Sequence, residues 1–322
     1  MPEAVVVKET GGPEVLEVVD AEPKTPGPGE VLVDVAAAGV NYIDTYHRAG
    51  AYPLPLPFGI GLEGAGTVSA VGEGARAAVG DRVAWSGTLG SYAAQAVVPV
   101  ADTVPVPDGV ELETAAALML QGLTAHYLVT SVHSVREGDT VLVHAAAGGV
   151  GLLLTQLAKA RGARVIGTVS TAAKAELAEA AGAAHVIRYD EVDFADAVRE
   201  LTDGDGVHAV YDGVGATTFD ASLSVVRRRG VLALFGAASG PVPPVDPQRL
   251  NQQGSIYLTR PKLGDFVATP EELRARTDDL FQAVLAGALD VRVGAQYALA
   301  EVRAAHEDLE GRRTTGKLLL IP

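Results

Sequence analysis

The residues with the clearest chemistry form a glycine turn between an expected strand and an expected helix. The turn reads Ala146-Ala147-Gly148-Gly149-Val150-Gly151, and it follows an apolar run that ends at His144. With Ala146 in the first glycine position, this spacing is that of the dinucleotide fingerprint. Gly148 would let the backbone approach a pyrophosphate, which would lie on free N–H groups at the helix N-terminus, and Gly151 would let helix and strand pack closely. A purely structural turn can carry such glycines, but the order strand, turn, helix favours a dinucleotide site.

The residues after the next expected strand distinguish the two nicotinamide dinucleotides. An NAD site there usually carries an acidic residue that binds the ribose 2′-hydroxyl. Here residues 167–174 contain no acid, and the first one is Glu176. Ser170 and Thr171 can donate hydrogen bonds, and Lys174 can place a positive charge near a 2′-phosphate. Lys174 alone would pass for a solvated helix lysine, but with the acid missing the segment favours NADPH.

Alternating strands and helices surround the glycine turn and would hold it in place. A helical, Ala/Leu-rich stretch over residues 114–129 precedes this alternation. Such an order is typical of a doubly wound parallel sheet, the Rossmann fold. The expected strands are 140–144, 164–169, 185–187, 209–212, 231–235 and 255–259, and the expected helices are 150–161, 172–181, 194–201 and 218–226.

The first 120 or so residues have a different pattern, with short apolar runs separated by Gly and Pro. This pattern favours a compact, β-barrel-like domain with one short helix at 42–49. Its expected strands include 31–36, 66–71, 81–85 and 93–98. After an expected helix at 270–286, the run 316–321 ends the chain as a strand that could return to this first domain. The sequence thus predicts an α/β protein whose nucleotide domain is an insertion.

Composition narrows the function classes. The formal net charge of −15 disfavours nucleic-acid and membrane partners. The absence of cysteine excludes disulfides, thiolate zinc sites and cysteine nucleophiles. No signal-peptide pattern and no apolar run of about 18 residues is present, so we expect a cytoplasmic enzyme. The seven histidines include no i,i+4 pair, and His144 is expected to be packed or hydrogen-bonded rather than catalytic.

Several segments together resemble the zeta-crystallin-like quinone oxidoreductases of the medium-chain dehydrogenase/reductase superfamily, and the match covers nearly the whole chain. The segments that carry it are Ala38-Gly-Val-Asn-Tyr-Ile-Asp44, Gly61-Leu-Glu-Gly-Ala-Gly66, His144-Ala-Ala-Ala-Gly-Gly-Val-Gly151, Leu250-Asn-Gln-Gln-Gly-Ser-Ile-Tyr-Leu-Thr-Arg-Pro261 and Gly311-Arg-Arg-Thr-Thr-Gly-Lys-Leu-Leu-Leu-Ile-Pro322. The resemblance implies a GroES-like catalytic domain (residues 1–122 and 263–322), an inserted Rossmann domain (123–262), a cleft between them, and a homodimer formed largely through the Rossmann domain.

The resemblance also implies site residues. Asn41 and Asp44 would lie near the nicotinamide, and Thr124 would contact that ring. Tyr46 and Tyr52 could line the acceptor pocket, although ordinary packing would explain these tyrosines equally well. The expected cofactor residues are Ala146, Gly148, Gly149, Val150, Gly151, Ser170, Thr171, Lys174, Tyr189, Phe235, Gly236 and Arg312.

Zinc-dependent relatives differ from this chain at the positions of the metal ligands. They place Cys where Asn41 stands and His where Leu62 stands, and they carry a four-cysteine structural lobe. A zinc ion held only by oxygen ligands would be poor chemistry for this fold. No metal is therefore expected.

A site without a metal needs an acceptor that takes hydride or electrons readily, and quinones qualify. The protein would then act by positioning the acceptor and excluding water. The expected function is therefore an NADPH:quinone oxidoreductase. Reduction of activated C=C bonds in enones or enoyl thioesters is one alternative, and a non-catalytic, crystallin-like NADPH-binding role is another. The sequence assigns neither a proton donor nor the number of electrons transferred at once.

Overall fold

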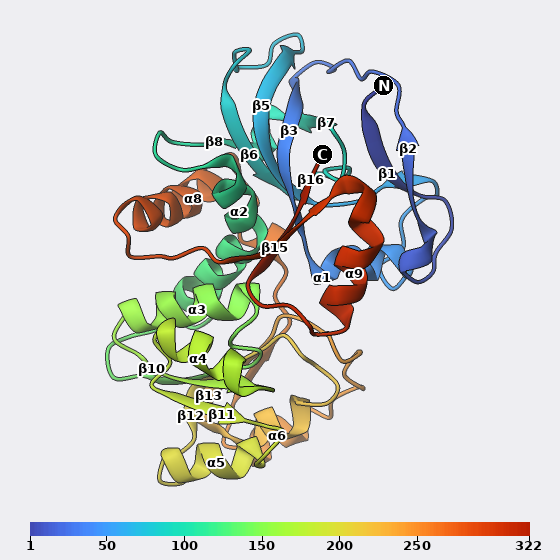
Figure 1. Cartoon of the computed structure of the whole chain (residues 1–322). Helices are drawn as coiled ribbons and strands as arrows, with labels where there is room; N and C mark the ends of the chain where they lie inside the picture. Colours follow the sequence, from blue (N-terminus) through green and yellow to red (C-terminus); the bar gives the residue numbers. More distant parts are fainter. The chain divides into compact units, whose positions relative to one another are not determined.

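The chain folds into two compact units, and the computed structural model describes all residues from 1 to 322. Unit 1 consists of Met1–Leu123 and Val267–Pro322, and unit 2 of Thr124–Phe266 (Figure 1). The predicted α/β class is confirmed, and the sequence predicts an insertion of one domain into the other. The sequence predicts the two boundaries after residues 122 and 262.

Unit 1 is built on two antiparallel-rich sheets. The larger has the strand order β15-β16-β3-β5-β6-β8, with β7 paired to β3, and the smaller has the order β2-β1-β4. The last strand, β16, pairs antiparallel with β3, which confirms the predicted return of the chain to its first domain. The strands are β1 (Glu3–Val7), β2 (Leu16–Asp20), β3 (Glu30–Val40), β4 (Phe58–Gly59), β5 (Glu63–Val71), β6 (Arg82–Ser86), β7 (Gln95–Pro99), β8 (Thr103–Pro105), β15 (Val293–Ala298) and β16 (Lys317–Ile321).

The helices of unit 1 pack against its sheets, and two of them carry residues of the candidate site described below. They are α1 (Tyr42–Arg48), α8 (Pro270–Leu285) and α9 (Val302–Glu310), with the short turns η1 (Pro13–Val15), η2 (Val100–Asp102) and η5 (Leu299–Glu301). Helix α2 (Leu112–Tyr127) begins in unit 1 and ends in unit 2. Together with its π-helical continuation, the helix is long and apolar enough to cross a membrane. However, 72% of this apolar stretch is buried within the protein, as is usual for a core helix.

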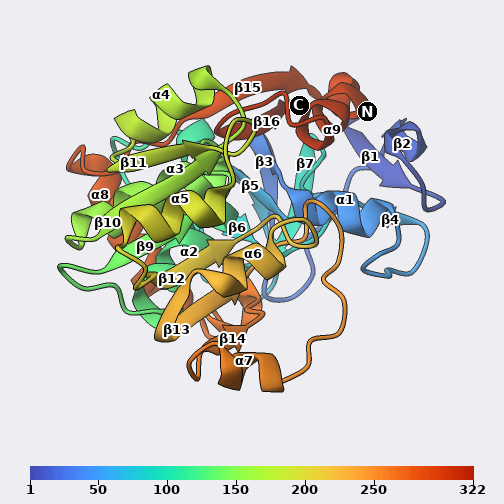
Figure 2. The same ribbon diagram turned by 90° about the horizontal axis from the view of Figure 1, so that it is seen from below.

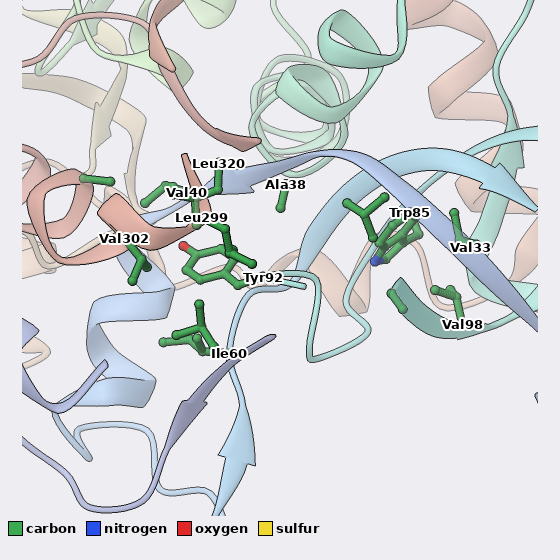
Figure 3. Close-up of a cluster of buried hydrophobic side chains, with 14 of the residues drawn as sticks. Val33, Ala38, Val40, Ile60, Trp85, Tyr92, Val98, Leu299, Val302 and Leu320 are labelled. Carbon is green, nitrogen blue, oxygen red and sulfur yellow. The ribbon is translucent and has the colours of Figure 1, made fainter. Parts of the chain in front are cut away.

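The core of unit 1 lies between its sheets and α9. Alternate residues of β16 and β3 point into it, among them Val33, Val40 and Leu320. Figure 3 shows Tyr92 in the same cluster, its ring among aliphatic side chains. Burying each such aliphatic side chain contributes about 1.5–3 kcal/mol to the stability of the fold. This packing holds the loop that carries Tyr92 in place.

Unit 2 is a parallel six-stranded sheet with the order β11-β10-β9-β12-β13-β14, the strand order of a Rossmann fold. Helices α3 to α6 pack along its strands (Figure 2). The strands are β9 (Thr140–Val143), β10 (Arg164–Val169), β11 (His185–Arg188), β12 (Val207–Asp212), β13 (Val226–Leu234) and β14 (Tyr257–Thr259). The helices are η3 (Leu128–Val132), α3 (Gly149–Ala160), α4 (Ala172–Ala180), α5 (Phe194–Leu201), α6 (Phe219–Ser224), α7 (Gln248–Gln252) and η4 (Leu263–Asp265).

The predicted elements of unit 2 fit the structure except around residue 226. The sequence predicts a helix through that residue and a strand from 231, but α6 ends at Ser224 and β13 already begins at Val226. The strand bulges, because its partners on β12 jump from Val226 to Val231 and Arg229 has a φ of 60°. Three consecutive exposed arginines hide the start of this strand from a reading of apolar periodicity.

Candidate active site

The glycine turn joins β9 to α3 as the sequence predicts. Its helix begins at Gly149, and the N-cap residue Gly148 is extended and offers no side chain to cap the first turn. The first N–H groups of a helix have no partner within the helix. An uncapped N-terminus of this kind suits a phosphate group.

Two glycines, one in the turn and one on β10, are required by space. A Cβ on Gly151 would lie 2.3 Å from the Ala145 carbonyl oxygen and 2.8 Å from the Ala146 Cα. Gly151 therefore lets α3 pack onto the end of β9. Ala146 occupies the first fingerprint position because Gly167 on β10 makes room, since a Cβ there would lie 2.8 Å from the Ala146 Cβ. The alanine in the motif is thus compensated by a glycine on the neighbouring strand.

The residues expected to bind the 2′-phosphate lie at the same edge of the sheet. Strand β10 runs parallel to β9, so its carboxyl end, followed by Ser170, lies beside the glycine turn. Thr171 caps α4 by accepting a hydrogen bond from the Lys174 backbone N–H (3.3 Å), so Lys174 lies in the first turn of that helix. Tyr189 follows β11 at this edge and donates its backbone N–H to Val169.

The loops after β12 and β13 meet at the same edge. The backbone N–H of Phe235 donates to the Asp212 carbonyl (2.8 Å). A Cβ on Gly236 would lie 2.4 Å from the Gly213 carbonyl oxygen, so this glycine too is required by space. Thr124 is buried in the last part of α2, which belongs to unit 2.

A buried hydrogen-bond network, which the sequence does not reveal, fixes these loops. Asp212 accepts hydrogen bonds from the Val214 and Gly215 N–H groups and from the hydroxyls of Thr218 and Ser222. The Ser222 hydroxyl therefore accepts from His144 Nε2 (2.8 Å), and His144 Nδ1 accepts from the Thr168 hydroxyl (2.8 Å). Burial lowers the pKa of His144. As predicted, His144 is buried and hydrogen-bonded.

In unit 1, the ends of three neighbouring strands bring polar residues together. In the sheet, β3 lies between β16 and β5, with Leu318 opposite Val40 and Gly64 opposite Ala38. This register places Lys317 and Glu63 on either side of the end of β3, where Asn41 follows. The Lys317 ammonium donates to Glu63 and to Asn41 Oδ1 (2.8 Å).

The Asn41 side chain is fully used within unit 1. Its amide donates to Glu63 (2.8 Å) and to the Gly39 carbonyl (3.3 Å), while its oxygen accepts from Lys317 and from the Gln121 amide (3.2 Å). A contact from Asn41 to an acceptor oxygen would need one of these bonds to be exchanged. Gln121 Oε1 is buried and has no partner.

This arrangement does not fit a catalytic zinc ion. Glu63 and Lys317 are 0% and 1% exposed, so the Glu63 carboxylate is already paired with a buried ammonium. Leu62 is apolar and buried, and no three His, Cys, Asp or Glu side chains in the chain are grouped to hold a metal. The ligand set that zinc requires is not available from Asn41, Leu62 and Glu63.

Asp44 begins a second buried network. Its Oδ2 accepts the Asn41 backbone N–H and the Tyr92 hydroxyl, each at 2.8 Å. The Tyr92 oxygen lies 3.3 Å from His306 Nε2, and His306 Nδ1 lies 3.0 Å from Arg48. Arg48 also binds Glu310 through both carboxylate oxygens (2.8 and 3.0 Å).

The expected acceptor-lining tyrosines follow Asp44 on α1 and in the next loop. Tyr46 and Tyr52 pack edge to face with ring centroids 5.4 Å apart, and Tyr52 is 43% exposed. Arg312 follows α9 in a left-handed conformation with a φ of 56°. Burial raises the pKa of Tyr42, and the charge of Arg312 opposes this shift.

The predicted residues therefore fall into two groups, one in each unit. Glu63, Lys317, Tyr92, His306, Arg48 and Gln121 do not appear among them. The available signal was a charged residue at the start of an apolar strand, as at Lys317, and a histidine on a helix near the chain end. Neither pattern indicates which residue the side chain will contact, because partners such as Lys317 and Glu63 are 254 residues apart in the sequence.

Comparison with known proteins agrees with this architecture. Residues 27–108 match the alcohol dehydrogenase GroES-like domain, and residues 149–281 match the family described as zinc-binding dehydrogenase. The quinone oxidoreductase of Pseudomonas aeruginosa is 50% identical, with 97% of each chain covered, and the 2-haloacrylate reductase of a Burkholderia species is 41% identical, with 99% of this chain and 98% of the relative covered.

A solved mycobacterial structure complexed with NADPH superposes with a TM-score of 0.97, at 57% identity and with both chains fully covered. The two domain families occur here in this order, and the identity to curated relatives extends over nearly the whole length. Together these findings give one assignment. The chain belongs to the quinone oxidoreductases of the medium-chain dehydrogenase/reductase superfamily.

Proposed function

We propose that this chain is an NADPH:quinone oxidoreductase that works without a metal. The observation that carries the proposal is the uncapped N-terminus of α3 beside a β10 end that has a lysine and no acid. The mycobacterial structure with NADPH, at 57% identity, supports the same cofactor. The P. aeruginosa relative supports the quinone as acceptor.

In this proposal unit 2 holds the cofactor. The pyrophosphate would bind the N–H groups of Gly149 and Val150, and the 2′-phosphate would bind Ser170, Thr171 and Lys174, with Tyr189 beside it. Phe235, Gly236 and Thr124 would contact the nicotinamide end. When bound, NADPH supplies the hydride. The residues of the chain orient the reactants and exclude water.

Unit 1 would hold the acceptor, and its charges support chemistry without zinc. The Lys317 ammonium stands beside Asn41 and Glu63, where zinc-dependent relatives need metal ligands. With no Lewis acid to polarise a simple carbonyl, the acceptor must be easily reduced. Asn41, Asp44, Tyr46 and Tyr52 are the residues we propose on the acceptor side.

Reduction of activated C=C bonds is the second candidate function, because the 2-haloacrylate reductase is 41% identical over nearly its whole length. The two functions can be distinguished by comparing the steady-state rates of NADPH oxidation with 1,4-benzoquinone and with 2-alkenals. We expect faster turnover with the quinone. Stronger turnover with the alkenals would replace the quinone proposal by the second candidate, and tight NADPH binding without turnover would favour a non-catalytic role.

We also propose a cytoplasmic homodimer. The sheet of unit 2 ends at β14, an edge strand whose Tyr257 is 65% exposed, and an open edge of this kind suits pairing with a second copy. The lack of cysteine fits a reducing compartment. Sedimentation analysis would test the dimer, and Tyr257→Asp should weaken it.

A further inference from the structure

Asp212, at the end of β12, is a fully buried carboxyl held by neutral hydrogen-bond donors. Its Oδ1 accepts the N–H groups of Val214 (2.8 Å) and Gly215 (3.0 Å), and its Oδ2 accepts the hydroxyls of Thr218 (2.7 Å) and Ser222 (2.9 Å). Because all four partners donate, they stabilise the ionised carboxylate. A buried charge is costly without such bonds, so the carboxylate holds the loop after β12 in the conformation that supplies them.

The backbone of Asp212 holds a second loop, the one after β13. Its carbonyl oxygen accepts the N–H groups of Phe235 (2.8 Å) and Gly236 (3.4 Å). Ser239 then ties this second loop to the first, because its N–H (2.7 Å) and its hydroxyl (2.8 Å) both donate to the Val214 carbonyl. One residue therefore fixes both loops, the first through its side chain and the second through its carbonyl.

His144 connects these two loops to the glycine turn. Burial lowers its pKa, so the imidazole is neutral and carries one N–H. The only proton of the Ser222 hydroxyl goes to Asp212, so Ser222 accepts from His144 Nε2–H (2.8 Å). His144 Nδ1 then accepts from the Thr168 hydroxyl (2.8 Å), and the Thr168 carbonyl accepts the N–H of Ala146 in the turn (3.1 Å). The hydrogen bonds thus run in one direction, from β10 through His144 and Ser222 to Asp212.

The hydroxyl of Ser222 serves this network rather than its own helix. A serine inside a helix commonly bonds a carbonyl of the preceding turn. Ser224, two residues further along α6, does this by donating to the Ala221 carbonyl (2.8 Å). Ser222, which is 0% exposed, instead joins His144 to Asp212.

We propose that Ser222 and His144 are positioning residues for the nicotinamide half of NADPH, acting through Asp212 on the loops after β12 and β13. This inference rests on the proposed function, in which the loop after β13 contacts the nicotinamide end. The 2′-phosphate of the adenosine half would bind at the end of β10, outside these two loops. The network should therefore affect the binding of one half of the cofactor and not of the other.

The test is calorimetric titration of the full-length protein with two ligands, NADPH and adenosine 2′,5′-bisphosphate. The second ligand contains the adenosine half with its 2′-phosphate and lacks the nicotinamide. Ser222→Ala should raise the Kd for NADPH about 10-fold, because a hydrogen bond to a charged group is lost from the network that holds the loops. The Kd for the bisphosphate should stay at the wild-type value.

Ser224→Ala is the matched control, since it removes a hydroxyl from the same helix outside the network, and it should change neither Kd. His144→Leu removes both imidazole hydrogen bonds and should show the same difference between the ligands as Ser222→Ala. His144→Gln keeps an N–H that can donate to Ser222, so its Kd for NADPH should lie between those of wild type and His144→Leu. A merely structural role would lower the thermal midpoint of the variants without this recovery and without separating the two ligands.

Two results would overturn the inference while leaving the proposed function intact. One is an equal rise in Kd for both ligands in Ser222→Ala, and the other is an unchanged Kd for NADPH in both Ser222→Ala and His144→Leu. A wild-type protein that binds neither ligand would instead overturn the proposed cofactor site and, with it, the positioning role.

Discussion

Removing the charge of Lys317 should destabilise unit 1 strongly. Lys317→Met keeps the length of the side chain but leaves Glu63 as a buried carboxylate with no counter-charge. It also removes the bond to Asn41 Oδ1. Breaking a buried ion pair by removing one partner costs about 3–5 kcal/mol, because the remaining charge stays out of water. We expect a loss of that size.

The chain provides a local reporter for this measurement. Its only tryptophan, Trp85, is fully buried on β6 in unit 1, so tryptophan fluorescence during denaturant unfolding follows that unit. Lys8→Met is the matched control. Lys8 pairs with Glu17 in the same unit, but the two side chains are 58% and 44% exposed. This exposed pair should contribute less than about 1 kcal/mol.

A second substitution separates lost packing from the isolated charge. Adding Glu63→Gln to Lys317→Met removes the unpaired carboxylate, so the double variant should be more stable than the single one. Equal losses for Lys317→Met and Lys8→Met, or no recovery in the double variant, would refute this reasoning.

Three further predictions concern the cofactor and the acid. Gly151→Ala should abolish NADPH binding in a fluorescence titration, because its Cβ would lie 2.3 Å from the Ala145 carbonyl oxygen; binding of wild-type strength would contradict this close approach. Lys174→Ala combined with Arg312→Ala should raise the Kd for NADPH far more than that for NADH, at about 1.5–3 kcal/mol for each charged contact, and equal losses would refute the 2′-phosphate assignment. The pKa of Asp44 in the folded protein is about 7, above its ordinary value of 3.8. The stability of the wild type relative to Asp44→Asn should therefore fall as the pH rises from 3.8 to about 7, by about 4 kcal/mol in total. A stability difference that does not depend on pH would contradict this pKa shift.

Local sequence patterns were sufficient for most of unit 2. Helix α5 has the predicted bounds, Phe194–Leu201, and the strands of the sheet were expected because each is a short apolar run followed by an amphipathic helix. The beginning of β13 could not be predicted, since Arg227 to Arg229 lack apolar periodicity and a bulge absorbs them. The strand register, which a sequence pattern does not contain, decides that feature.

The buried networks of unit 1 lay beyond sequence reasoning for a related reason. Asn41 and Asp44 stand in a motif and were predicted as site residues. Their partners come from α9 and β16, and Arg48 and His306, for example, are 258 residues apart. Only the return of the last strand to β3 brings them together. A sequence shows which residues can ionise, while their tertiary partners determine the charge that they carry.

The most direct test of the account is a crystal structure of the chain with NADPH, soaked with 1,4-benzoquinone. We expect the pyrophosphate on the N–H groups of Gly149 and Val150, and the 2′-phosphate on Ser170 and Lys174. A nucleotide bound away from the β9–α3 turn, or a metal ion at Glu63 in place of the Lys317 ammonium, would contradict the account.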